Sequence, residues 1–145
     1  MQDFPHHYHV NATAQVTGNV AINSGAMPPL ASAPPAEFGG PGDQWSPEHL
    51  LMASVADCFA LTFRAIAAAS KLEWSDLAAD AEGVLDRVER VTQFTAIAVK
   101  ATLTVPAGVD EAKAQRILHK AEDACLITNS LSADTHLETA IIAAS

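Results

Sequence analysis

The chain has 145 residues, of which 49% are hydrophobic, and its formal net charge is -9 at pH 7. This length and composition predict a single domain over residues 1–145, with a core large enough to fold without disulfide bonds. Residues 1–63 contain no Lys or Arg and five acidic residues, which argues against binding to nucleic acid or to a membrane surface. The two cysteines and the lack of a signal-peptide pattern favour a cytoplasmic protein whose thiols are catalytic or redox-sensing.

The first third of the chain predicts strands and a long loop. Residues 8–16 alternate apolar and polar side chains, the pattern of a half-buried strand, and Gly18-Asn19 allows a tight turn into a strand at residues 20–22. Residues 24–45 contain five prolines and four glycines, a composition that excludes a long helix or a central strand. Loops of that length in compact domains are usually functional or disordered.

A long helix is predicted to start at Ser46, Pro47 and Glu48, because a serine caps orphan N–H groups, proline fits the first turn and an acid suits the positive helix end. Its apolar residues cover nearly the whole circumference as far as residue 70. The length would suit a membrane span, but Asp57 and Arg64 would each cost a few kcal/mol at a bilayer centre. We therefore predict a core helix enclosed by protein.

The rest of the chain predicts a hairpin, a second helix and a last strand. Residues 76–87 and 97–105 alternate in polarity on either side of a turn near Glu89-Arg90, Asp110 caps a helix that ends near Cys125, and residues 134–142 can add a strand. This order of elements predicts an α+β fold. A fully apolar helix also needs more cover than one thin sheet provides, which favours a homodimer.

Cys58, near the middle of the long helix, and Cys125 are the chain's only thiols. Only a thiolate is nucleophilic, and a thiol midway along an apolar helix is desolvated, so we expect the pKa of Cys58 to rise unless a cation is close. Arg64 lies roughly 120° around the helix from Cys58 and points elsewhere. Arg87 and Arg90, beside the hairpin turn, are the better activating candidates, although the pattern favours solvated turn residues over this role.

Five segments together resemble the family of osmotically inducible protein C (OsmC) and organic hydroperoxide resistance protein (Ohr). They are residues 34–42, 45–51, 58–59, 105–108 and 121–131. Each segment is weakly informative alone, but their order and spacing are specific, and the resemblance covers nearly the whole chain.

The resemblance implies an intertwined homodimer whose long central helices are wrapped by two antiparallel sheets, with active sites at the subunit interface. It also implies a thiol peroxidase in which Cys58 attacks the peroxide, Cys125 resolves the product and Glu48 holds an activating Arg. An external dithiol or lipoyl-type reductant would restore the thiols, with no cofactor and no metal. The chain departs from the family pattern in one respect, because no cation precedes Arg64.

The expected substrates are alkyl or lipid hydroperoxides, because the site would be lined by apolar residues, namely Phe38, Trp45, Leu51, Met52, Phe59 and Phe63. A different reading is a non-catalytic or weakly active OsmC-like protein that binds or senses a small lipophilic ligand at the dimer interface, and a third is a structural or redox-buffering dimer. Either cysteine could be an inert core residue and Glu48 a simple first-turn acid. The cluster of His6, His7 and His9 has no matching ligands, so no metal site is expected.

Overall fold

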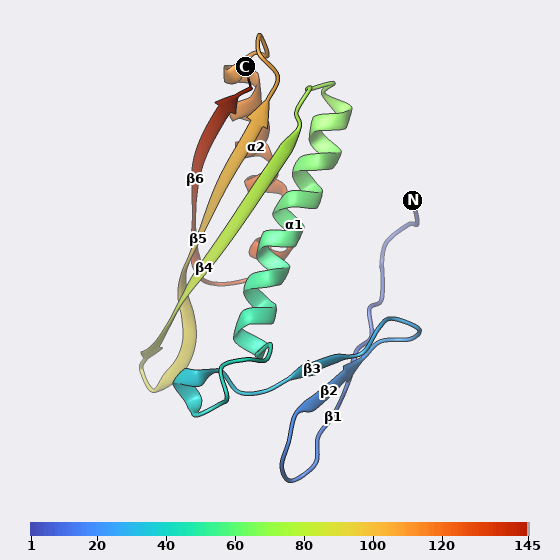
Figure 1. The fold of residues 1–145 in the computed structure, drawn as a ribbon, viewed down its shortest axis with the longest axis vertical. Helices are drawn as coiled ribbons and strands as arrows, with labels where there is room; N and C mark the ends of the chain where they lie inside the picture. Colours follow the sequence, from blue (N-terminus) through green and yellow to red (C-terminus); the bar gives the residue numbers. More distant parts are fainter. Residues whose placement is uncertain (145) are drawn as a thin grey trace. The chain divides into compact units, whose positions relative to one another are not determined.

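The computed structural model describes residues 1–144, and the chain divides into two units, Met1–Leu50 and Leu51–Ser145 (Figure 1). The prediction of a single domain stays a prediction. The elements in chain order are β1 (Asn11–Thr13), β2 (Val20–Asn23), β3 (Leu30–Ser32), the 3-10 helix η1 (Ala36–Phe38), α1 (Pro47–Ala69), β4 (Asp76–Val88), β5 (Val91–Val105), α2 (Glu111–Ala124), α3 (Leu126–Asn129) and β6 (Asp134–Ala143).

The first unit contains a three-stranded antiparallel sheet in the order β1-β2-β3. β1 and β2 form the predicted hairpin, and Gly18 adopts a φ of 92° in the connection. The prediction of a tight turn is wrong, because residues 14–19 separate the two strands. The prediction of a half-buried strand over residues 8–16 is wrong: only Asn11–Thr13 form β1, and all three are exposed. Alternation predicts which side chains share a face, but burial needs a second layer to cover that face, and β1 has none within its unit.

The proline- and glycine-rich segment contains one short edge strand, β3, and the 3-10 helix η1. Its remaining residues are irregular, but backbone hydrogen bonds connect the middle of the segment to its end. Ser32 forms a bridge with Trp45, and the Ala33 N–H donates to the Trp45 carbonyl at 2.8 Å. Gly40 is required by this path, because a Cβ at this position would collide with the Pro34 carbonyl oxygen. The composition correctly excluded a long helix and a central strand, but it did not predict β3.

The long helix is confirmed as α1, and Ser46 caps it as predicted, since its Oγ accepts the His49 N–H at 3.1 Å. The prediction that this helix is completely enclosed by protein is wrong within one chain. Only Val55, Phe59, Phe63 and Ala67 are buried, at a spacing of four residues, which is one face of a helix. On the opposite side Leu61 is 50% exposed, and Asp57 and Arg64 are also exposed.

By length and composition α1 could cross a membrane, with a mean hydropathy of 1.6. Core helices of soluble proteins pass the same test. In this chain α1 packs with β5 and α2 around one hydrophobic core, and two exposed charges interrupt it. We therefore describe α1 as a core helix whose buried face packs with β5 and α2.

The second unit contains a three-stranded sheet in the order β4-β5-β6. β4 and β5 form the predicted antiparallel hairpin, and Glu89 and Arg90 adopt left-handed φ angles of 49° and 69° in its turn. β6 runs parallel to β5, so the prediction of purely antiparallel sheets is wrong for this sheet. The reason is that α2 returns the chain along the sheet between the two strands, and a crossover helix brings the next strand in with the same direction.

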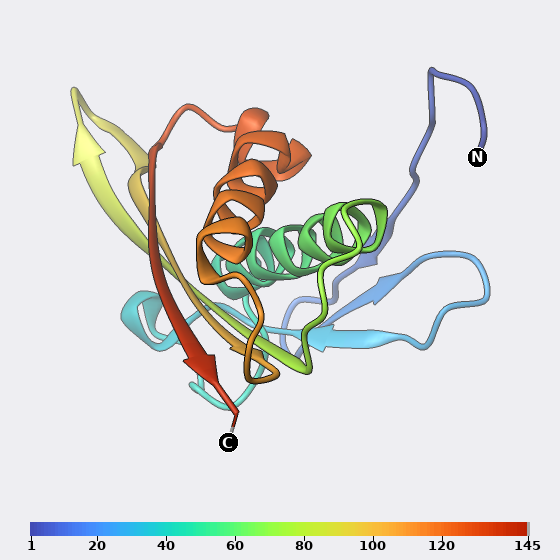
Figure 2. The same ribbon diagram turned by 90° about the horizontal axis from the view of Figure 1, so that it is seen from above.

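Helices α1 and α2 lie on the same face of the β4-β5-β6 sheet (Figures 1 and 2). The core between these two layers is formed by buried residues from α1, the connector between α1 and β4, β5, α2 and β6. They are Val55, Phe59, Phe63, Ala67, Leu72, Ile97, Val99, Ala101, Leu103, Val105, Ala114, Ile117, Leu118, Ala121 and Leu137. Asp110 caps α2 as predicted, accepting the N–H groups of Ala112 and Lys113. The two helices thus place the two cysteines on the same side of the sheet.

Candidate active site

Cys58 lies beside the buried face of α1, one residue before the core residue Phe59, and its side chain is partly exposed. One turn further along the helix, the Thr62 hydroxyl oxygen lies 3.9 Å from the Cys58 sulfur. Residues four apart on a helix share a face, so this contact follows directly from the sequence spacing. Cys58 therefore has a hydroxyl group in hydrogen-bonding range of its sulfur.

Cys125 occupies the corner where α2 ends and the short helix α3 begins. Its side chain is only 1% exposed. Its N–H donates to the Glu122 carbonyl at 3.2 Å, and its carbonyl accepts the Thr128 hydroxyl at 3.2 Å and the Asn129 N–H at 3.1 Å. The corner is thus held by hydrogen bonds on both sides of Cys125.

Both thiols are free, and the Cys125 thiol is one of the groups that lower the pKa of Cys58. The Cys125 thiol hydrogen-bonds to the Cys58 sulfur, and the backbone N–H groups of Ile127 and Leu126 donate to the same sulfur. The sequence left open whether residues 58 and 125 would approach each other. In the folded chain the α2–α3 corner, residues 122–130, brings them together.

The pKa of Cys58 is set by two opposing effects. Burial raises it, whereas hydrogen bonds from the Ile127 N–H, the Cys125 thiol, the Thr62 hydroxyl and the Leu126 N–H lower it, and the net result is a pKa below the usual thiol value. The expectation that this pKa would rise without a nearby cation is therefore wrong. Backbone and hydroxyl donors stabilise the thiolate in place of a positive side chain, because hydrogen bonds to the charged form favour it.

No cation of the described chain contributes to this shift. Arg87 lies near the end of β4 and Arg90 in the turn that follows, and both are exposed, as is Arg64 on α1. Within one chain the two turn arginines therefore do not act on Cys58. Their action on the Cys58 of a second subunit stays a prediction.

Glu48 lies in the first turn of α1. Its Oε2 atom is buried and has no hydrogen-bond partner among residues 1–144. A buried carboxylate oxygen without a partner is costly, so this atom marks a place where a donor from outside the chain would be stabilising. The expected role of Glu48 in holding an arginine stays a prediction.

The expected apolar lining residues are distributed over both units. Phe38 and Trp45, in the first unit, are 59% and 48% exposed. In the second unit Phe59 is a core residue that is 1% exposed, and Met52 packs over Gly83 of β4, where an added Cβ would lie 2.7 Å from the Met52 sulfur. Phe63 is also fully buried, in contact with the Trp74 ring at a centroid distance of 5.3 Å. Phe59 and Phe63 thus serve the core first.

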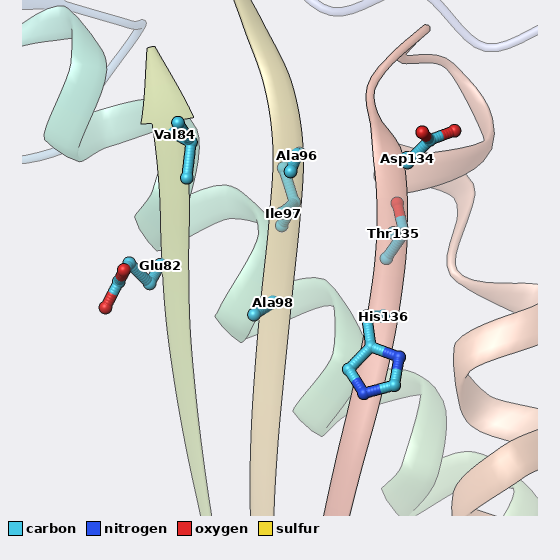
Figure 3. A pocket seen from close by; sticks show the side chains of 8 residues that line it. All are labelled: Glu82, Val84, Ala96, Ile97, Ala98, Asp134, Thr135 and His136. Atoms are coloured by element: carbon cyan, nitrogen blue, oxygen red, sulfur yellow. The ribbon is translucent and has the colours of Figure 1, made fainter.

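A separate hollow of about 350 Å³ lies on the other face of the β4-β5-β6 sheet (Figure 3). Ala96 and Ala98 lie in its floor, and Glu82 and His136 stand on the two neighbouring strands. These side chains alternate with the buried ones that face the helices, so the hollow and the thiols lie on opposite faces. Among residues 1–144, no group of three or more His, Cys, Asp or Glu side chains could hold a metal ion.

Sequence reasoning missed Thr62 and helix α3. The spacing of four residues between Cys58 and Thr62 could have identified the hydroxyl group. The N–H groups of Leu126 and Ile127 carry no such signal, because every residue other than proline has a backbone donor and only the fold decides which ones reach a sulfur.

Comparison with known proteins decides the family. The family model described as OsmC-like protein matches residues 40–140. The chain belongs to the OsmC-like protein family. This OsmC-like chain is 27% identical over 138 residues to the uncharacterized protein YmaD of Bacillus subtilis (strain 168), covering 92% of this chain and 91% of YmaD. It is also 30% identical over 125 residues to the organic hydroperoxide resistance protein of Xanthomonas axonopodis pv. citri, with 84% of each chain covered.

A solved structure is similar to the OsmC-like chain over most of its length. The OsmC-like protein VCA0330 of unknown function from Vibrio cholerae matches with a TM-score of 0.84 at 14% identity, covering 94% of this chain and 100% of the other. Identity at this level supports the fold alone. The α+β architecture is thus confirmed as OsmC-like, and the family includes proteins named for organic hydroperoxide resistance.

Proposed function

We propose that this OsmC-like protein is a thiol-dependent peroxidase that reduces organic hydroperoxides to alcohols. The observation that carries the proposal is the pair of thiols at the α2–α3 corner, in which the Cys58 sulfur accepts hydrogen bonds from the Cys125 thiol and from two backbone N–H groups. A nucleophilic cysteine needs a stabilised thiolate and access to its substrate. Cys58 has both, since the pKa is lowered and the side chain is partly exposed.

The proposed reaction has two steps within the protein. The Cys58 thiolate attacks one oxygen of the hydroperoxide, the O–O bond breaks, and the products are a Cys58 sulfenic acid and an alkoxide that takes up a proton to become the alcohol. Cys125 then attacks the sulfenic sulfur and water leaves, which gives a Cys58–Cys125 disulfide. An external dithiol, of the lipoyl type or otherwise, would reduce this disulfide, with no bound cofactor or metal required for any step.

Alkyl or lipid hydroperoxides are the proposed substrates. Met52 on α1 provides apolar surface within the second unit, and apolar surface favours the alkyl part of a peroxide over water. The relative from Xanthomonas axonopodis pv. citri is named for resistance to organic hydroperoxides, which agrees with this substrate class.

A homodimer in the cytoplasm is proposed as the working form. Leu61 is 50% exposed on α1, and Ala65, Ala68 and Ala69 are also exposed. Although the charged Asp57 and Arg64 are exposed on the same helix, these residues leave apolar helix surface for a second copy to cover. A second subunit would also offer the buried Glu48 Oε2 atom a donor. Arg87 or Arg90 of that subunit is the proposed source.

Turnover of tert-butyl hydroperoxide or cumene hydroperoxide with dithiothreitol as reductant tests the proposal. We expect wild-type protein to consume peroxide and Cys58→Ser to consume none. Cys125→Ser is the matched control: without dithiothreitol it should consume about one peroxide per Cys58 thiol and carry a sulfenic acid in place of the disulfide, because the sulfenic acid has no thiol partner within the chain. Turnover in Cys58→Ser equal to the wild type would refute the peroxidase.

A second candidate function is binding or sensing of a small lipophilic ligand by a weakly active protein. It is favoured by the absence of Lys and Arg from residues 1–63 and by the unpartnered Glu48 oxygen. This candidate predicts slow alkylation of Cys58 at neutral pH and no peroxide consumption. Rapid alkylation would exclude it and would leave the peroxidase as the better explanation.

A further inference from the structure

The two sulfurs of the proposed disulfide differ in exposure. Cys125 is 1% exposed, whereas Cys58 is partly exposed. We propose that the external dithiol attacks the Cys58 sulfur of the disulfide, so that the mixed disulfide forms on Cys58 and Cys125 is the leaving thiol. This inference rests on the proposed function, because it concerns the step that regenerates the enzyme.

Cys125 is expected to remain shielded in the oxidised protein. In the reduced protein the Cys125 thiol is near enough to the Cys58 sulfur to lower its pKa as a hydrogen-bond donor. The α2–α3 corner is held by the bonds from Thr128 and Asn129 to the Cys125 carbonyl. Thr128 is itself 9% exposed, and Ala121, one turn before Cys125 on α2, is fully buried. An incoming thiol would have to displace this packing to reach Cys125.

Access to Cys58 is required by the peroxidase reaction itself. The hydroperoxide must reach the Cys58 sulfur, and the same opening can admit a thiolate. Thiol–disulfide exchange proceeds by attack on one sulfur with departure of the other, and the outcome depends on which sulfur can be reached. Burial therefore directs the reductant to Cys58.

A second effect acts in the opposite direction. Thiols of lower pKa are better leaving groups, and the pKa of Cys58 is lowered by its hydrogen bonds, so leaving-group ability alone would favour attack on Cys125. The effect of leaving-group pKa on rate is gradual, whereas a sulfur without access does not react until the corner opens. We therefore expect access to determine the site of attack.

The chemistry balances in two exchanges. In the first, a thiolate of the dithiol bonds to the Cys58 sulfur, the Cys58–Cys125 bond breaks, and Cys125 leaves as a thiolate that takes up a proton. In the second exchange, the other thiol of the reductant loses its proton and attacks the reductant sulfur that is bonded to Cys58. This attack releases the Cys58 thiolate and an oxidised, cyclic reductant. Two electrons pass from the dithiol to the protein.

Mapping of the mixed disulfide tests the inference in wild-type protein. The disulfide is prepared with diamide, which makes the test independent of peroxide chemistry. The oxidised protein is mixed briefly with glutathione, a monothiol that cannot complete the second exchange internally, then quenched with acid and alkylated with N-ethylmaleimide. We expect glutathione on the Cys58 peptide and maleimide on the Cys125 peptide, in at least about tenfold excess over the reverse pattern.

The reverse pattern, or equal amounts of the two, would overturn the inference, as would a failure of diamide to link the two cysteines. If diamide forms the disulfide but tert-butyl hydroperoxide does not, the proposed peroxidase fails while the site of thiol attack is still measured. The two failures are thus distinguishable.

Two single-thiol variants provide an independent readout. Cys125→Ser retains only Cys58, and Cys58→Ser retains only Cys125. In folded protein we expect the aromatic disulfide reagent DTNB to react with Cys58 at least about tenfold faster than with Cys125, and in urea at similar rates. Equal rates in the folded variants, with folding verified by circular dichroism, would overturn the inference.

Discussion

Replacement of Thr62 by valine tests whether hydrogen bonding activates Cys58. Valine has nearly the shape of threonine and a similar helix propensity, so the change removes the hydroxyl group 3.9 Å from the sulfur with little effect on packing. A hydrogen bond to a charged group contributes about 1.5–3 kcal/mol at good geometry. The contact here is long and partly exposed, so we expect the Thr62 hydroxyl to stabilise the thiolate by about 0.5–1 kcal/mol. At pH values below the midpoint of the Cys58 titration, this corresponds to about a two- to fivefold change in the thiolate fraction.

The assay is the pH dependence of Cys58 alkylation by iodoacetamide, followed by mass spectrometry of the Cys58 peptide. The quantity to compare is the rate at pH 7 divided by the rate on the high-pH plateau, because this ratio reports the thiolate fraction independently of intrinsic nucleophilicity. We expect the ratio to fall about two- to fivefold in Thr62→Val and the midpoint to move to higher pH.

Thr62→Ser is the control, since it retains the hydroxyl group and should keep the wild-type profile. An unchanged ratio in Thr62→Val would refute the role of this hydroxyl. A loss of the same size in both variants would assign the effect to packing instead.

Three further predictions concern stability. Gly83→Ala should destabilise the fold by about 1–3 kcal/mol in urea denaturation, because the new Cβ would lie 2.7 Å from the Met52 sulfur and 2.8 Å from two Phe94 ring carbons. Addition of Met52→Ala should recover only the part of the loss that comes from Met52, and full additivity of the two changes would contradict that clash. Asp110→Ala should cost about 1 kcal/mol through loss of the α2 cap, whereas Asp110→Asn should cost little, and equal losses would argue against capping. The pKa of Glu122 is raised by burial and by Asp123, so ionisation of this carboxyl lowers the stability of the fold as the pH rises through that pKa. Glu122→Gln should raise the free energy of unfolding by about a few tenths of a kcal/mol at pH 7 after screening and should not change it at pH 3. An equal gain in stability at both pH values would refute this electrostatic effect.

The fold was largely predictable because its main signals are local. The helix start at Ser46, the hairpin turn at Glu89-Arg90 and the cap at Asp110 depend on residues adjacent in sequence, and all three are confirmed. The exposed strand β1 and the parallel direction of β6 were not predicted. Both depend on how distant elements pack, which alternation along one strand does not encode.

The two cysteines of the candidate site were predictable from the sequence, but the groups that stabilise the thiolate were not. The positions of Cys58 and Cys125 suggested a redox pair, and in the folded chain the Cys125 thiol contributes to lowering the pKa of Cys58. The source of thiolate stabilisation was predicted incorrectly, because sequence reasoning looked for a cationic side chain. The donors are instead backbone N–H groups at the α2–α3 corner, together with hydroxyl and thiol groups, and backbone donors leave no trace in side-chain identity.

Peptide mapping after oxidation tests most directly whether Cys58 and Cys125 form one redox couple. The reduced wild-type protein is treated with one equivalent of tert-butyl hydroperoxide, alkylated and digested without reductant. We predict a single linked pair of peptides, one containing Cys58 and the other Cys125, with no linkage when Cys125 is replaced by serine. Recovery of both cysteines as separately alkylated peptides, with the peroxide unconsumed, would contradict a catalytic role for this pair.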